Sequence, residues 1–219
     1  MKTLLIIFIF FSVATFAQNN QTKNDSTLVH GIQFQLPNIL SIGNFDGYTF
    51  AYRYKLNKNS GYRFGFTTNV RNNNSNSNEL RDTLLYKTSL INENYFIKFS
   101  AQYIRSIMSY QNFSFIIGGG PSVLYRRKNN IIKHPQTRTA NLFTSYGIGA
   151  DFLAGVEYRL YKNIVISGEY GLDIVWKRNN IESKLTDNNY SLSNKTNTER
   201  EDSFDINNKH ALLGITIYF

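Results

Sequence analysis

The chain has 219 residues, no cysteine and a formal charge of +9, from 24 Lys and Arg against 15 Asp and Glu. The length fits a single all-β domain, and the lack of cysteine excludes both disulfide staples and a lipoprotein anchor. The basic residues are scattered, with Arg126–Lys128 the one tight run, so we do not expect nucleic-acid binding. The mean hydropathy of −0.34 is that of a soluble protein, yet membrane strands carry a weak hydropathy signal because half of their residues avoid lipid.

The first residues have the pattern of a secretory signal peptide. Lys2 precedes an apolar run over Leu4–Val13, and small residues follow up to Ala17. The run is shorter than the ~20 residues that a spanning helix needs, so a signal peptide is favoured over a membrane anchor. We predict three parts: a signal peptide over 1–17, a disordered mature N-terminus over 18–28, and a single domain over 29–219.

From residue 29 onward, apolar and polar residues alternate in segments typical of β-strands. Pro37 makes the first segment marginal because proline cannot donate to a ladder. The run Gly118–Pro121 interrupts another segment, as a bulge or bend would. We predict eight strands, over about 29–42, 47–56, 61–70, 95–107, 113–127, 145–160, 164–177 and 209–219.

The connections alternate between short turns and long polar segments. The short turns are expected at 57–60, 109–112 and 161–163, because these segments carry Asn, Ser and other turn-forming residues. The long segments, at about 71–94, 128–141 and 178–205, are expected to be loops. This rhythm is typical of an outer-membrane barrel, which has short periplasmic turns and long external loops.

The alternation leaves open whether the apolar faces point inward, as in a soluble lipocalin-like barrel, or outward into lipid. The polar faces carry small residues and both signs of charge, which suits the narrow lumen of an eight-stranded barrel. Aromatic residues gather near the strand ends, where interfacial girdles lie. We therefore predict a polar lumen network of Arg53, Arg63, Lys98, Asp151, Glu157, Arg159, Glu169 and Asp173. The predicted membrane-interface aromatics include Tyr48, Tyr54, Tyr62, Tyr146, Tyr158 and Trp176.

The chain ends on a strand whose alternate residues are Leu213, Ile215, Ile217 and Phe219. This ending resembles the C-terminal signal that the barrel-assembly machinery reads. The chain resembles the small OmpA/OmpX-like outer-membrane barrels, and its Asn-rich segments and "GGGPSVLYR" are similar to the PorT-like outer-membrane β-barrel domain family. The resemblance implies an all-β, eight-stranded antiparallel transmembrane up-and-down β-barrel. It also implies export by the signal peptide to the outer membrane of a diderm bacterium.

The expected role is structural or interactive, with long polar extracellular loops on display. The expected partners are the lipid bilayer and lipopolysaccharide, the barrel-assembly machinery and a protein of the envelope. We expect no cofactor and no metal, because the three histidines show no ligand spacing. Two alternatives stay open: a lipid-modifying enzyme of the acyl hydrolase or transferase type, using His210 with Ser145 or Ser167, and a narrow pore or secretion accessory.

Overall fold

The structure is a computed structural model that describes residues 29–37, 48–81, 84–133, 137–187, 195–208 and 211–219. The signal peptide and disordered segment predicted over 1–28 lie outside these residues. The described part contains no helix long and apolar enough to cross a bilayer. Its strands are β1 (His30–Pro37), β2 (Tyr48–Lys55), β3 (Ser60–Arg81), β4 (Leu84–Tyr110), β5 (Phe113–Lys133), β6 (Thr137–Arg159), β7 (Ile164–Asp187), β8 (Lys195–Asn208) and β9 (Leu212–Tyr218).

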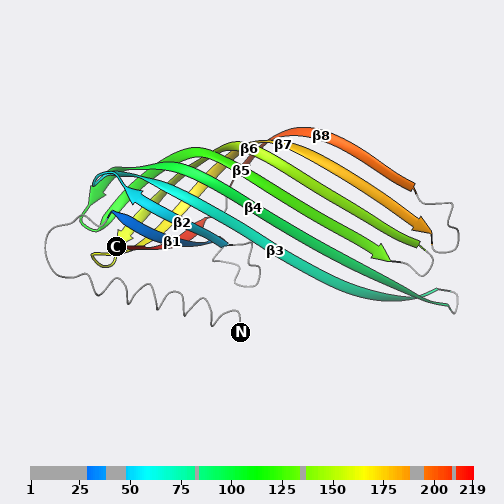
Figure 1. Ribbon diagram of the computed structural model, residues 1–219. Coiled ribbons are helices and arrows are strands. Elements are labelled where there is room, and N and C mark those ends of the chain that lie inside the picture. The colour runs from blue at the N-terminus through cyan, green and yellow to red at the C-terminus, as the bar shows by residue number, and fades with distance from the viewer. Residues whose placement is uncertain (1–28, 38–47, 82–83, 134–136, 188–194, 209–210) are drawn as a thin grey trace.

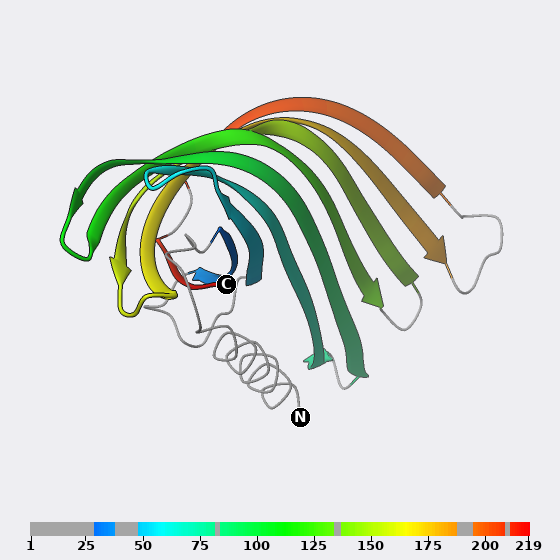
Figure 2. The ribbon, with the colours of Figure 1, turned by 60° about the vertical axis from the view of Figure 1, so that its left-hand side comes forward.

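All described strands belong to one antiparallel sheet that closes into a ring of eight. Each of β1 to β7 pairs with the next strand, and β9 pairs with both β7 and β1 (Figure 2). The backbone of Phe219 donates to the His30 carbonyl at 2.8 Å, which ties the last strand to the first. The marginal first segment is therefore a full partner in the ring over His30–Pro37, and the predicted eight-stranded fold is confirmed.

Two strands, β8 and β9, pair with different parts of β7. β8 pairs with the C-terminal part of β7, from Leu172 to Leu185, while β9 pairs with the N-terminal part, from Ile164 to Glu169. The register differs by one residue between the two pairings, Leu172↔Asn208 and Glu169↔Leu212.

The three long segments expected to be loops are mostly strand, so that expectation is wrong. β3 and β4 keep a single register from Ser60↔Arg105 to Arg81↔Leu84, through the whole Asn- and Ser-rich segment. β5 with β6 and β7 with β8 extend in the same way. Asn and Ser have low strand propensity, but uninterrupted pairing with a neighbour overrides it. The six strands β3–β8 thus project beyond the ring as a curved sheet (Figure 1), which we call the extension.

Side chains in the ring alternate between a mostly polar inside and an apolar outside. Phe64 is 51% exposed and Phe152 is 46% exposed, whereas their neighbours Arg63 and Asp151 are 5% and 1% exposed. A lipocalin-like barrel would show the reverse, so the soluble alternative is excluded. Outward apolar residues line every strand of the ring, and these include Ile32, Phe50, Tyr62, Phe99, Phe115, Ile148, Tyr170 and Ile215.

The height of this apolar exterior matches a bilayer. On β6 the outward aromatics Tyr158 and Tyr146 lie about 40 Å apart along the strand, at ~3.3 Å per residue. A barrel strand tilted by about 40° converts this length into a height of about 30 Å, the thickness of a hydrocarbon core. Beyond Tyr146 the same face of β6 is mixed, with Thr144, Leu142, Ala140 and Arg138 in turn. The fold is therefore a transmembrane β-barrel of the outer-membrane type.

Two glycines are required because strands approach each other closely. A Cβ on Gly120 would lie 1.9 Å from the backbone oxygen of Ala101, and one on Gly149 would lie 2.1 Å from that of Ile174. Backbone atoms in a hydrogen-bonded barrel have little freedom to move away. Gly120 belongs to the predicted interruption at Gly118–Pro121, and there the β4–β5 ladder omits Ala101 and Gln102.

We predict that Gly120→Ala lowers the free energy of unfolding by about 1–3 kcal/mol, because the added methyl group overpacks the wall. Urea titration in phospholipid vesicles, read by the heat-dependent shift of the folded band on gels, measures the change. Gly168→Ala is the matched control, since its Cβ would meet no atom nearer than 4.0 Å. Equal stability of the two variants would contradict this packing argument.

Candidate functional site

The centre of the lumen holds a buried ion pair between β3 and β7. The Arg63 Nη1 donates to both Glu169 oxygens, at 2.8 and 2.7 Å, and the two side chains are 6% and 1% exposed. Gln33 of β1 donates to the same carboxylate at 3.2 Å and to the Ser167 hydroxyl at 3.1 Å. These bonds connect three strands that are far apart in the sequence.

The network continues across the lumen to β4 and β6. Arg63 Nε donates to the Gln102 side-chain oxygen at 2.8 Å, and Gln102 donates to Asp151 at 3.3 Å. The Lys98 ammonium then lies 2.7 Å from Asp151 and 2.6 Å from Asp173. Buried charges are tolerable only when they are paired and hydrogen-bonded in this way. The barrel wall is thus cross-braced from inside.

A second buried pair lies nearer the short turns. Arg53 of β2 contacts Glu157 of β6, and its guanidinium also lies 5.9 Å from the ring of Tyr218. Of the eight residues predicted for the lumen network, seven are therefore ion-paired inside the barrel. The eighth, Arg159, is exposed at the rim and has no ion pair in the described residues.

An apolar layer lies inside the lumen on the short-turn side of the network. Ile104, Ile116 and Leu153 are 5%, 3% and 7% exposed and pack against one another. They project inward from β4, β5 and β6. Apolar side chains therefore lie in the lumen at this level, and ion pairs lie in it at the next.

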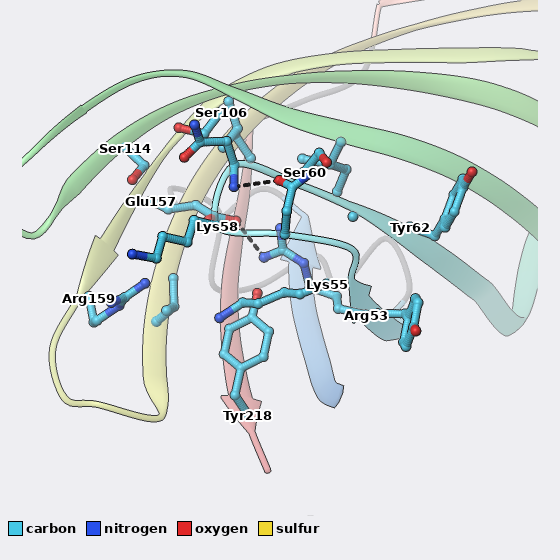
Figure 3. Close-up of a pocket in the computed structure, with 17 residues that line it drawn as sticks. Arg53, Lys55, Lys58, Ser60, Tyr62, Ser106, Ser114, Glu157, Arg159 and Tyr218 are labelled. Atoms are coloured by element: carbon cyan, nitrogen blue, oxygen red, sulfur yellow. Dashed lines mark hydrogen bonds and ion pairs between the residues drawn. The ribbon is translucent and has the colours of Figure 1, made fainter. Parts of the chain in front are cut away.

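Beneath the apolar layer, a pocket of about 70 Å³ opens at the short-turn end (Figure 3). Ile104 and Ile116 line its base, and the β2–β3 turn borders it. Lys55, Lys58 and Arg159 also line it, and their cationic ends extend to the same side in Figure 3. We call this space the mouth pocket.

The serines considered for an enzyme face the lumen. Ser167 is fully buried and accepts a hydrogen bond from Gln33, and Ser145 is 2% exposed. Both are therefore remote from lipid on the outside of the wall. His210 lies outside the described residues. No group of three or more His, Asp or Glu residues in the described chain is arranged to hold a metal ion.

The predicted interface aromatics lie at the two ends of the apolar exterior. At the short-turn end, Tyr54 and Tyr62 are cross-strand partners, and Tyr158 packs on Phe113 with ring centroids 4.6 Å apart. At the extension end lie Tyr48, Tyr146 and Trp176. The rings of Tyr146 and Tyr125 are 5.2 Å apart, those of Tyr48 and Phe34 are 5.9 Å apart, and Arg178 lies 5.3 Å over Trp176.

The predicted assembly residues occupy β9 and the chain end. Leu213 and Ile215 face outward at 37% and 39% exposure, and Phe219 is 48% exposed. Ile217 is 9% exposed and is opposed by Ile32 on β1 and Ile164 on β7. Three of the four are thus accessible from the membrane side.

Charged pairs also join the strands of the extension. Lys177 contacts Asp205 at 2.5 Å, and Arg178 contacts Asp202 at 2.9 Å. The hydrogen bond from Arg178 lowers the pKa of the Asp202 carboxyl and raises the pKa of the guanidinium. This second pair is exposed on both sides, so water and salt screen it.

Sequence reasoning missed several polar residues that complete the lumen. Gln33, Gln35 and Thr216 are at most 2% exposed, and Gln102 connects two ion pairs. A signal existed for the first three, since each alternates with outward apolar residues. The mouth pocket had no such signal, because its lining comes from many strands and a turn that are far apart in the sequence.

Known proteins of similar structure share little sequence with this chain. No protein-family model and no curated protein sequence matches the chain. Among solved structures, a major outer membrane protein of Thermus thermophilus matches with a TM-score of 0.48 and 15% identity, covering 87% of this chain and 98% of that one. Ail, the attachment invasion locus protein of Yersinia pestis, matches with a TM-score of 0.41 and 14% identity, covering 87% of this chain and 97% of that one. Acinetobacter baumannii CarO2 matches with a TM-score of 0.35 and 12% identity, covering 87% of this chain and 98% of that one.

All three TM-scores lie below 0.5. The assignment of the fold therefore stands on the strand register and the side-chain directions of this chain itself. Since no family model matches, the resemblance to PorT-like barrels stays a prediction.

We predict that Arg63→Met lowers the free energy of unfolding by about 3–5 kcal/mol, because it leaves the buried Glu169 carboxylate without its cation. The double variant Arg63→Met with Glu169→Met should lose less free energy of unfolding than this single variant, because neither charge remains buried alone. Urea titration in vesicles measures both. Arg127→Met, on the exposed extension, is the control for loss of an arginine. If Arg63→Met were as mild as Arg127→Met, the lumen pair would not brace the barrel.

Proposed function

We propose that the protein is an integral outer-membrane β-barrel with a structural or interaction role, which presents its extension outside the cell. One observation carries this proposal: an apolar exterior of bilayer height ends at aromatic girdles, and a polar sheet continues beyond one end only. The other end has turns as short as residues 111–112. Short turns at the periplasmic side and long projections outside are the usual arrangement of such barrels.

The edges of the extension support an interaction role. In the described chain, the outer half of β3 pairs only with β4, and β8 pairs only with β7. Open strand edges offer unpaired backbone groups to another chain. β8 is densely charged, with Glu199, Arg200, Glu201 and Asp202 in succession, and charges on an edge oppose unselective pairing. An envelope protein partner is therefore proposed at this sheet, rather than at flexible loops.

Lipopolysaccharide is proposed as the lipid partner of the outward face. Arg127, Arg138 and Lys184 line a hollow on β5, β6 and β7, together with Glu182. Arg127 lies two residues after the girdle aromatic Tyr125, and Arg178 lies two residues after Trp176. Cations at this level would meet headgroup phosphates. The outward side chains of β9 are proposed to serve the barrel-assembly machinery.

The described features favour neither alternative role. A narrow pore or secretion accessory would need an open lumen, but ion pairs and the layer of Ile104, Ile116 and Leu153 occupy it. A lipid-modifying enzyme would need its serine near lipid, but Ser145 and Ser167 face inward. Membership of the PorT-like family is proposed on the sequence resemblance alone.

The absence of native cysteine allows a direct test of location and orientation. We predict that Thr198→Cys, exposed on β8, reacts with a membrane-impermeant maleimide in intact cells. Lys162→Cys, exposed in the β6–β7 turn, should react only after the outer membrane is permeabilised. The native chain is the unlabelled control. Reaction of Lys162→Cys in intact cells without reaction of Thr198→Cys would reverse the orientation, and recovery of the protein in the soluble fraction would refute the barrel.

A further inference from the structure

The mouth pocket contains more positive charge than its own carboxylate can offset. Arg53, Lys55, Lys58 and Arg159 line it with a single acidic residue, Glu157. Arg53 already engages that carboxylate. In the described chain, the other three cations have no ion-pair partner. Arg159 and Arg53 repel the Lys55 ammonium, and Glu157 attracts it more weakly.

The Lys55 side chain and the turn that carries Lys58 are held in place by the surrounding strands. The Lys55 ammonium lies 3.5 Å over the ring of Tyr218, which is 3% exposed and whose backbone donates to Asn163 at 2.7 Å. The β2–β3 turn that carries Lys58 is fixed at both sides. Leu56 donates to the Ser60 carbonyl at 2.9 Å, and Ser106 of β4 donates to the Asn59 carbonyl at 2.7 Å. A fixed group of like charges in a partly enclosed space favours a bound anion.

The donors of the pocket match a phosphate better than a carboxylate. One arginine can satisfy both oxygens of a carboxylate in a bidentate pair. Here two ammonium groups and a guanidinium come from β2, the β2–β3 turn and β6. Such donors approach from several directions, as the oxygens of a phosphate require. The volume of about 70 Å³ is large enough for a phosphoryl group.

We propose that the mouth pocket binds a phosphate group through Lys55, Lys58 and Arg159. Its placement on the periplasmic side rests on the orientation proposed above. Two sources share this chemistry: a phospholipid headgroup of the inner leaflet, which lies beside the girdle residues Tyr54 and Tyr62, and a phosphate-bearing solute of the periplasm.

The test titrates inorganic phosphate into the full chain in a maltoside detergent, with phosphate-free buffer, and follows binding by calorimetry. The native protein should bind in a saturable way, and Lys55→Met with Arg159→Met should weaken binding at least about tenfold. Lys128→Met with Lys133→Met removes the same charge from exposed positions of the extension and should leave binding unchanged. Lys58→Met changes a residue of the turn alone, so it should weaken binding without disturbing a strand. The heat-dependent gel shift confirms that each variant is folded.

Non-saturable binding, or equal binding by the pocket variants and the extension variant, would overturn the proposal. The source is decided in maltoside micelles, which carry no phosphate, doped with either phosphatidylglycerol or oleic acid at equal charge. Weaker binding of inorganic phosphate in the phosphatidylglycerol micelles indicates a headgroup in the pocket, and equal binding indicates a solute. The detergent assay is independent of orientation. Absence of binding therefore refutes this inference alone, whereas reversed cysteine labelling refutes the proposed function.

Discussion

The need to pair every backbone group inside lipid determines the rest of this structure. Hydrocarbon offers no hydrogen-bond partner, so a sheet spans a membrane only if its two edges meet. Here the edges meet where β9 pairs with β1, from Leu212↔Pro37 to Tyr218↔Gly31. The C-terminal strand therefore both completes the ring and places the side chains of Leu213 and Ile215 on the membrane side. Beyond the pairing of Leu212 with Pro37, β3–β8 continue as an open sheet in the described chain.

Closing the ring forces half of the side chains into a narrow interior, and the polar network follows from that. Charges placed there without partners would oppose folding, since each carries a large desolvation cost. The chain pairs Arg63 with Glu169 and places Lys98 between two aspartates, with glutamines connecting the pairs. The interior polarity that lowers the mean hydropathy is thus a structural brace. The unpaired cations lie at the mouth, where solvent and ligands have access.

The sequence predicted the ring well because lipid and lumen impose opposite demands on alternate residues. Phe64 and Phe152 are exposed on the outside while their charged neighbours are buried inside, as that constraint requires. The three short turns lie close to the segments that Asn and Ser indicated. The extension was not predicted, because water bathes both of its faces and the alternation disappears in segments such as Asn72–Ser77. The mouth pocket was not predictable, because Lys55, Ser114 and Arg159 meet only after the ring has closed.

The central claim, that the apolar face meets hydrocarbon while the polar face lines a sealed interior, is tested most directly through the single tryptophan, Trp176. Its side chain is 42% exposed on the outer face of β7, at the girdle near the extension. With the protein inserted in vesicles, lipids brominated near the headgroups should quench its fluorescence more strongly than lipids brominated near the chain ends. Fluorescence that neither lipid quenches would place Trp176 away from the bilayer and contradict the account.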